Sequence, residues 1–308
     1  MNVRPKIMFS LDYEKGWGIH QFAKINKEKY DFFLKNEPRV LEATLNLFEK
    51  YNIRATWAVV GGMLCDSWEE FDSYGVPSPD YDNKKLGLDQ NIKNSKHLCE
   101  YFFDKESVQK ILDIDGQDIG GHSFSHSYFK ESGVKFSDFY KDTEALTRVF
   151  HNKFKHKIQT YVFPRNQIIS PEVLIDFGIK VYRGNSTKWY DRINSNSMDF
   201  LNLLSRFYRF YSALSPFAIS ERISSNFFVP AGIFLRFGLP TTLWESHFFK
   251  IKRCISGTKD EQLLHLWWHP HNLCIDYQIK LLRLEKILQF ITKKRDKGLL
   301  EIVNMNDI

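Results

Sequence analysis

Short apolar runs alternate with amphipathic segments along most of the chain. The amphipathic segments predict helices, because their apolar residues recur every three or four positions; they span residues 39–51, 107–112, 137–150, 170–177 and 276–294. The apolar runs predict strands over residues 6–11, 54–61, 118–119, 159–163, 179–182, 261–268 and 299–303. Strands that alternate with helices are typical of βα units around a parallel sheet, so the pattern predicts an α/β fold. Ser137 is expected to cap the third of these helices.

Two stretches interrupt this alternation. Residues 66–100 are interpreted as an irregular insertion, which fits a lid, a substrate rim or a plain surface loop. Residues 199–253 combine many aromatic residues with arginines and lysines. They are interpreted either as an extra helical hairpin packed on the main fold or as a patch that contacts a membrane holding a lipid-linked substrate. The expected organisation is one domain over residues 1–308, with insertions at about 66–100 and 199–253.

Composition narrows the class of protein. Hydrophobic residues make up 43% and charged residues 26% of the 308 positions, which is typical of a globular protein. The net charge of +6 is spread along the chain without a long basic run, so no nucleic-acid partner is expected. Aromatic residues reach 16%, more than a core requires, which suggests an aromatic groove or an apolar surface.

Cysteine spacing and the N-terminal sequence indicate a compartment. The four cysteines form no C-x-x-C pair, so free thiols are expected rather than a cysteine zinc site. Charged residues occur too early for a signal peptide, and no run of about eighteen apolar residues exists. A cytoplasmic location is expected, with peripheral attachment to the inner face of the membrane as the alternative.

Polar residues follow almost every predicted strand. Asp12 and Glu14 end the first strand, and because strand side chains alternate they point to the same side, ~7 Å apart. The other strand ends carry His122, His126, Arg165, Arg183, His269 and His271. The carboxyl ends of parallel strands meet at one edge of a sheet or barrel, so these side chains are expected to converge.

His122 and His126 are the first metal-ligand candidates. They are four residues apart, so a helical turn after Gly120 and Gly121 would place both imidazoles on one face. Imidazole nitrogens suit zinc and other borderline divalent metals. Two histidines cannot complete such a site, so a third ligand must come from elsewhere in the chain.

Five stretches together carry a resemblance to a known family: FSLDYE, RATWAVVG, DIGGHSFSH, YVFPRNQ and LHLWWHPHN. These stretches occur in the same order in the polysaccharide deacetylases, which the chain resembles. This family is carbohydrate esterase family four, also called the NodB-homology family. The stretch WWHPHN resembles the corresponding stretch in family members that are found with bacterial surface-glycan synthesis. The resemblance implies a distorted (β/α) barrel, and it leaves out residues 66–100 and 199–253, which are expected to be inserted loops and a helical, aromatic-rich insertion. It also implies metal-dependent removal of acetyl groups from N-acetylated sugars.

The same resemblance assigns roles to residues. It makes His122, His126 and Glu14 the metal ligands and Asp12 the general base. The family's first motif has two adjacent aspartates, and here Tyr13 stands at the second, so Asp12 and Glu14 can exchange roles. Arg165 is expected to orient Asp12 and keep it ionised. The general acid is His269, with His271 as the substitute. The expected substrate-binding residues are Trp17, Arg183, Trp189 and His271, and Trp267 is weighed as a rim or core residue.

The resemblance also implies cofactors and partners. The metal is a divalent ion, zinc foremost, with cobalt, nickel or manganese as alternatives. The substrate is an N-acetylated sugar, a nucleotide sugar or a lipid-linked glycan used in cell-surface polysaccharide or lipopolysaccharide synthesis. An amidase, an O-deacetylase and a non-catalytic glycan-binding protein remain alternatives. Two histidines and a carboxylate also suit non-haem Fe(II) oxygenases, whose fold spaces its ligands differently.

Overall fold

The structure is a computed structural model that describes residues 4–21, 27–185, 200–214, 221–222 and 227–308. Its strands are β1 Lys6–Tyr13, β2 Ala55–Val59, β3 Gln117–Gly121, β4 Thr160–Val162, β5 Val181–Gly184, β6 Glu221–Arg222, β7 Phe228–Pro230, β8 Ile233–Phe234, β9 Gln262–Trp268 and β10 Glu301–Val303. They form one sheet in the order β6-β9-β1-β2-β3-β4-β5-β7, with β10 beside β1 and β8 beside β9. Apart from β6 with β9, the pairs in this part of the chain are parallel, as the alternating pattern predicts.

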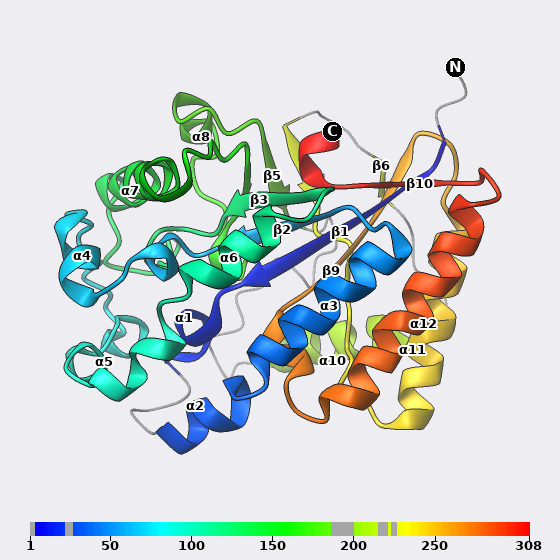
Figure 1. Ribbon diagram of the computed structural model, residues 1–308, viewed down its shortest axis with the longest axis horizontal. Coiled ribbons are helices and arrows are strands. Elements are labelled where there is room, and N and C mark those ends of the chain that lie inside the picture. Colours follow the sequence, from blue (N-terminus) through cyan, green and yellow to red (C-terminus); the bar gives the residue numbers. More distant parts are fainter. Residues whose placement is uncertain (1–3, 22–26, 186–199, 215–220, 223–226) are drawn as a thin grey trace.

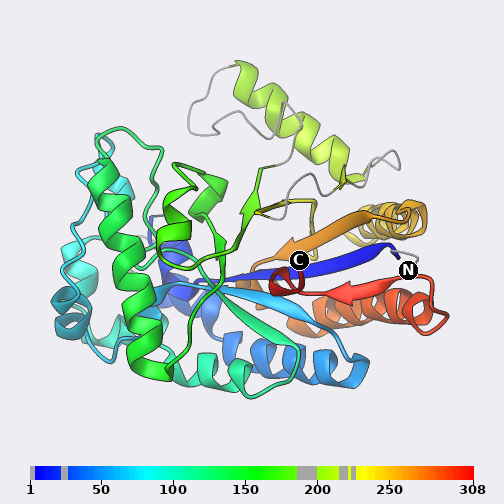
Figure 2. The same ribbon diagram turned by 90° about the horizontal axis from the view of Figure 1, so that it is seen from above.

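The sheet curls until its two ends are linked (Figure 2). β7 pairs with β5 at one end, whereas β8 pairs with β9 at the other. Only Ala231 and Gly232 separate β7 from β8. Gly232 has a positive φ of 66°, and a Cβ there would lie 2.1 Å from the carbonyl oxygen of His265. Glycine is therefore required where the chain crosses between the two ends.

Helices cover the outside of this sheet (Figure 1). They are α1 Lys15–Ile19, α2 Lys27–Leu34, α3 Glu37–Tyr51, α4 Trp68–Ser73, α5 Gln90–Lys93, α6 Lys105–Leu112, α7 Phe136–Phe154, α8 Val173–Asp176, α10 Phe200–Leu214, α11 Thr241–Gly257 and α12 Tyr277–Arg295. Short 3₁₀ turns occur at Gly61–Leu64, Lys84–Leu86, Lys96–Tyr101, Pro164–Asn166, Pro270–Leu273 and Met305–Asp307. The long predicted helices and the strands that flank them are confirmed, with shifts of a few residues at their ends.

The main core lies between the sheet and the helices packed on it, among them α3, α6, α7, α11 and α12. The apolar positions that predicted α3 are all buried: Val40, Leu41, Thr44, Leu45 and Phe48. The Phe48 ring contacts Phe9 of β1, Trp57 of β2 and Trp268 of β9. Burial of one helix face against three parallel strands fixes the carboxyl ends of those strands relative to one another.

Two local predictions were wrong. Residues 66–100 are not irregular throughout, because α4 and α5 form there. Ser67 accepts a hydrogen bond from Glu70 N, and Asp89 accepts one from Asn91 N, so each short helix has a capping side chain. Ser137 does not cap α7, which begins one residue earlier. The carboxylate of Asp138 accepts from the backbone N–H of Lys135 and fixes that end.

Residues 199–253 contain the two predicted helices, α10 and α11, and these contact each other. The same stretch also supplies β6, β7 and β8 to the sheet, so it is not a helical hairpin alone. None of the helices in the described residues is both long and apolar enough to cross a bilayer.

Candidate metal centre and active site

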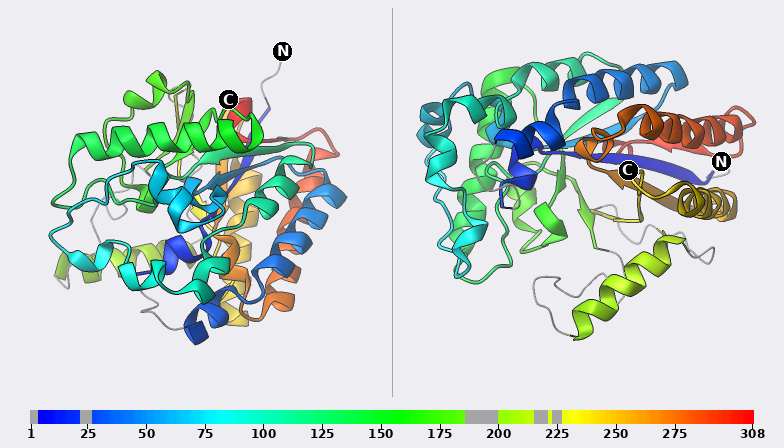
Figure 3. Two further views of the ribbon diagram at one scale, coloured as in Figure 1. Left: turned by 60° about the vertical axis from the view of Figure 1, so that its left-hand side comes forward. Right: turned by 90° about the horizontal axis from the view of Figure 1, so that it is seen from below.

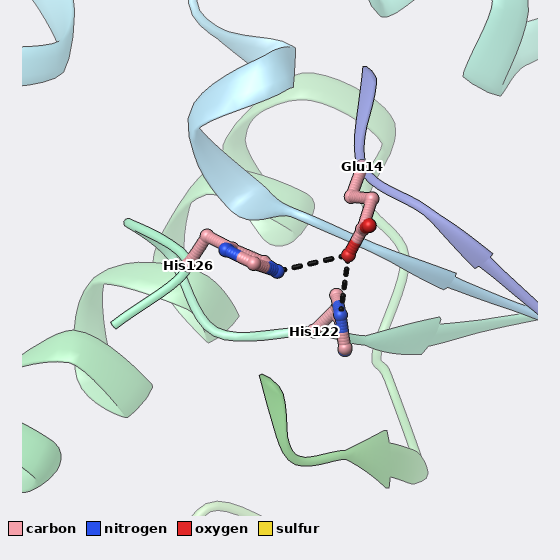
Figure 4. Close-up of side chains that lie close together, drawn as sticks. All are labelled: Glu14, His122 and His126. Atoms are coloured by element: carbon pink, nitrogen blue, oxygen red, sulfur yellow. Dashed lines mark hydrogen bonds and ion pairs between the residues drawn. The ribbon is translucent and has the colours of Figure 1, made fainter. Parts of the chain in front are cut away.

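Glu14, His122 and His126 converge at the carboxyl ends of β1 and β3 (Figure 4). Glu14 Oε2 lies 3.1 Å from His122 Nε2 and 2.8 Å from His126 Nε2. All three side chains are buried, and their three ligand atoms lie within 4.8 Å of one another. His122 and His126 follow Glu14 by 108 and 112 positions in the sequence. The three residues therefore form a cluster that could hold a metal ion.

The two histidines are brought together by a bent loop. The predicted helical turn is absent, because Ser123 and His126 have positive φ angles of 64° and 55°. The Asp142 carboxylate of α7 accepts hydrogen bonds from Phe124 N and Ser125 N, at 2.7 and 3.0 Å. With its N–H groups satisfied by this carboxylate, the loop does not need the hydrogen bonds of a helix.

Hydrogen bonds indicate the tautomer of His122. Its Nδ1 lies 2.8 Å from the carbonyl oxygen of Val162, so Nδ1–H donates there and Nε2 is the nitrogen that faces Glu14. Burial lowers the pKa of His126 to about 4, so His126 is neutral at physiological pH. Burial raises the pKa of Glu14, but its interactions with His269 and His126 and its hydrogen bonds with His122 and His126 outweigh burial and hold that pKa well below its usual value. Glu14 is therefore a carboxylate.

The chemistry of this donor set fits a divalent cation. His122 Nε2 and His126 Nε2 both face one oxygen of the ionised Glu14, at 3.1 and 2.8 Å, so two nitrogens and a carboxylate point to one place. Two imidazoles and one carboxylate suit zinc, and also cobalt, nickel or manganese. Three protein ligands leave room for water or substrate, as in catalytic rather than structural sites.

Contacts made by neighbouring residues fix the backbone and the side chain of Glu14. Lys15 has a positive φ of 42°, and its Nζ forms an ion pair with Asp104 at 2.7 Å. Tyr13 donates its hydroxyl to the same carboxylate at 2.9 Å. A Cβ at Gly18 would lie 2.0 Å from Glu14 Oε1, so only glycine leaves space for this side chain. Tyr13, which replaces the expected second aspartate, thus points away from the histidines.

Asp12 is paired with Arg183 and not with Arg165, which corrects the prediction. Arg183 Nη1 and Nη2 donate to the two Asp12 oxygens at 2.6 and 2.7 Å, and both side chains are buried. Burial raises the pKa of Asp12, but the Arg183 charge leads the effects that bring it below its usual value. Asp12 is therefore ionised, and Arg183 is not available as the predicted substrate-binding residue.

Three further residues fix Arg183, and the sequence did not single them out. Asn166 Oδ1 accepts from Arg183 Nε and Nη2, both at 3.2 Å. Ser10 Oγ accepts from Nη1 at 3.2 Å and lies 2.8 Å from His265 Nε2. Burial lowers the pKa of His265 to about 3, so this histidine is neutral. A histidine inside the apolar run LHLWW was the available signal.

Arg165 lies at the rim of the site. Its guanidinium stacks on the Tyr128 ring at 4.0 Å, and Tyr128 packs edge-on against His126 at 5.4 Å. It donates a hydrogen bond to Gln21 and lies 3.8 Å from Glu131. Arg165 follows Pro164 with a positive φ of 53°, and its side chain contacts these residues rather than Asp12.

His269 lies beside both carboxylates. Its Nε2 is 3.5 Å from Glu14 Oε1 and 3.6 Å from Asp12 Oδ2, and its side chain is 23% exposed. Asn272 Oδ1 lies 3.3 Å from Nδ1. The His271 ring stacks on His269 at 5.1 Å, and burial, then the His269 charge, lower its pKa to about 4. The structure therefore places His269 between the carboxylates and solvent, with His271 beside it.

The predicted sugar-stacking tryptophans have different outcomes. Trp17 is fully buried and donates to the carbonyl oxygen of Phe102, so the prediction that it contacts substrate was wrong. Trp189 lies outside the described residues. Trp267 is half-buried, with its ring 4.7 Å from Phe234 and 5.7 Å from His269. Trp267 and Phe234 thus form an aromatic surface next to the histidine.

A buried carboxyl group near Glu14 gives the protein a predicted pH dependence. Burial raises the pKa of Glu37 from 4.5 to about 8, and neither oxygen has a hydrogen-bond partner among the described residues. The folded state therefore binds this proton more tightly than the unfolded state. Between about pH 4.5 and about pH 8 the folded protein loses stability as the pH rises, by about 1.4 kcal/mol per pH unit.

Glu37→Gln removes this titration, so its free energy of unfolding should rise relative to wild type between about pH 5 and about pH 8. Urea unfolding at the two pH values measures the difference. Glu42→Gln, an exposed position on the same helix, is the control and should show no such change. Equal pH dependence in wild type and Glu37→Gln would mean that Glu37 is ionised in the folded protein.

Comparisons with models of known protein families and with curated proteins found no match to the chain. Solved structures share its fold. A Pseudomonas aeruginosa protein described as a probable polysaccharide deacetylase aligns over 99% of this chain and 90% of its own, with 10% identity and a TM-score of 0.56. A Mycobacterium smegmatis protein, provisionally described as a polysaccharide deacetylase, aligns over 100% and 89%, with 12% identity and a TM-score of 0.54. PuuE allantoinase aligns over 99% and 89%, with 11% identity and a TM-score of 0.55. The chain therefore has the predicted distorted (β/α) barrel, a curled parallel sheet covered by helices that these structures share.

Proposed function

We propose that the protein is a metal-dependent hydrolase that removes an N-acetyl group from a sugar or glycan intermediate. One observation carries the proposal. Glu14, His122 and His126 converge within 4.8 Å at the carboxyl ends of the strands, and the ionised Asp12 lies beside the same histidine as Glu14. Ligands, a base and a proton donor within one site are what hydrolysis of an amide requires.

The side chains take the following roles. Glu14, His122 and His126 would hold the metal, which when bound polarises the acetyl carbonyl and lowers the pKa of water. Asp12 accepts the proton of the attacking water. The C–N bond then breaks, acetate leaves, and His269 Nε2 gives its proton to the sugar amine.

The geometry favours Asp12 over Glu14 as the base. Glu14 faces both histidines, whereas Asp12 faces Arg183 and His269. Arg183 keeps Asp12 ionised and fixes its plane through two charge-assisted hydrogen bonds. His269 is favoured over His271 as the acid, because its Nε2 lies nearest to both carboxylates.

The substrate class is an N-acetylated sugar, carried as a nucleotide sugar or as a lipid-linked glycan in cell-surface polysaccharide or lipopolysaccharide synthesis. The half-buried Trp267 and Phe234 support a sugar, since an aromatic surface next to His269 can stack on a pyranose ring. Zinc is the proposed metal, with cobalt, nickel or manganese as substitutes.

The direct test is a panel of N-acetylated nucleotide sugars and lipid-linked sugars, incubated with the zinc- or cobalt-loaded protein. Mass spectrometry should find the loss of one acetyl group from one class, with an equal amount of acetate released. The same panel should include O-acetyl sugars and non-sugar amides. Turnover of a non-sugar amide alone would favour an amidase, and binding without turnover would favour a glycan-binding protein.

Arg165 should affect substrate binding rather than the chemical step. Its guanidinium lies flat on Tyr128 at the rim of the site and is not bonded to Asp12. Arg165→Ala is expected to raise KM about three- to tenfold with kcat within about twofold, the pattern of a lost binding contact. Arg148→Ala, an exposed arginine over Tyr74, is the matched control and should change neither constant. A large fall in kcat for Arg165→Ala would instead indicate that Arg165 takes part in the chemical step.

A further inference from the structure

Helix α10 exposes a stripe of large apolar side chains to solvent. Leu203 and Phe207, one turn apart, are 66% and 63% exposed. Phe210 and Tyr211 continue the same stripe and are also exposed, whereas Ser205 on the opposite side is fully buried. A helix on the surface of a water-soluble domain normally buries its apolar face and exposes its polar one. The exposed stripe of α10 is thus suited to contact with another apolar phase.

The helix is held in this orientation by its neighbour. The buried side chain of Lys250, on α11, donates a hydrogen bond to the carbonyl oxygen of Ser212 on α10. α11 in turn buries Trp244 and Ile251 in the core. Figure 3 shows α10 on the outer side of the molecule, with α11 between it and α12. The Phe207 and Tyr211 rings stack at 6.5 Å, so part of the stripe is already ordered.

We propose that α10 docks on the surface of a lipid bilayer with anionic headgroups. The sequence of α10 contains two arginines, Arg206 and Arg209, and no acidic residue, which complements anionic lipid. Phenylalanine, tyrosine and leucine along one stripe are typical of helices that lie in the membrane interface. At fifteen residues the helix is ~22 Å long, too short to span a bilayer but long enough to lie along one.

A second copy of the chain fits this stripe less well. The sequence of α10 carries two positive charges and no negative one, so two copies of this helix would repel each other. Anionic headgroups carry the complementary charge. Vesicle binding does not depend on turnover, so it is measured independently of the proposed chemistry.

The test is co-sedimentation of the full chain with phosphatidylcholine vesicles and with vesicles that also contain phosphatidylglycerol. Wild type should bind the anionic vesicles, and bind them less in high salt. The double variant Leu203→Ser/Phe207→Ser should lower the partition coefficient by about tenfold or more, since two apolar side chains no longer enter the interface. Ile279→Ser/Leu282→Ser alters two similarly exposed residues on α12 and should stay within about twofold of wild type.

Three outcomes would overturn the proposal. The first is a wild-type protein that sediments with neither kind of vesicle, and the second is an α10 variant that binds as well as wild type. The third is a concentration-dependent dimer in analytical ultracentrifugation that the α10 variant abolishes, which would assign the stripe to a second copy. Every substituted side chain is exposed, so all variants should fold. Circular dichroism spectra and thermal midpoints check this for each variant.

Discussion

Replacing Arg183 with methionine should lower the free energy of unfolding by roughly 3–5 kcal/mol, the cost of leaving a buried charge without its partner. The Asp12 carboxylate is buried and receives two hydrogen bonds from Arg183. Methionine has a similar volume but donates no hydrogen bond to Asp12. The loss should be largest above the pKa of Asp12 in the variant, because only the ionised carboxylate needs the arginine. Urea unfolding near neutral pH measures it.

Two variants isolate the cause of this loss. Arg165→Met removes the arginine that the sequence favoured, and its effect should stay within about 1 kcal/mol, since Arg165 is partly exposed and its ion pair with Glu131 is long. Adding Asp12→Asn to Arg183→Met should recover part of the stability by removing the unpaired charge. If Arg165→Met were as destabilising as Arg183→Met, the assigned pairing would be incorrect.

Asp12→Asn should reduce acetate release by about 10²–10⁴-fold, the usual contribution of a general base. Asparagine has nearly the same shape and retains an oxygen that can accept from Arg183, so the fold should persist. The metal content should also persist, because Asp12 is outside the cluster formed by Glu14, His122 and His126. The rate of acetate release and the metal content per chain are measured on the same preparation.

Glu14→Gln is the matched comparison for this variant. It changes the carboxylate that faces both histidines, so it should lose metal as well as activity. If instead Asp12→Asn lost the metal and Glu14→Gln kept it, the two carboxylates would have exchanged roles.

The sequence predicted the architecture because the main signals are local. Helical spacing in residues 39–51 and apolar runs such as 261–268 each need only a short window of sequence. Parallel order then places strand ends together, so the meeting of Glu14 with His122 and His126 could be predicted without knowing any loop conformation.

The errors concern residues whose neighbours are distant in sequence. Arg165 follows β4 whereas Arg183 lies within β5, and which of them reaches Asp12 depends on the backbone direction after Pro164 and on the position of β5. The loop that presents His126 depends on Asp142, a residue of α7. Trp17 was expected to contact substrate, but packing from residues 66–100 buries it, including Trp68 and Phe71. Such contacts leave no periodic signal.

Glu14, His122 and His126 are proposed to bind one divalent ion. Zinc content per chain, measured by plasma mass spectrometry after dialysis against trace zinc, tests it for wild type and for His126→Ala. About one equivalent in wild type and under about a tenth in the variant is the predicted result. A wild-type protein that retains no zinc, cobalt, nickel or manganese, or a variant that retains as much as wild type, would contradict the claim.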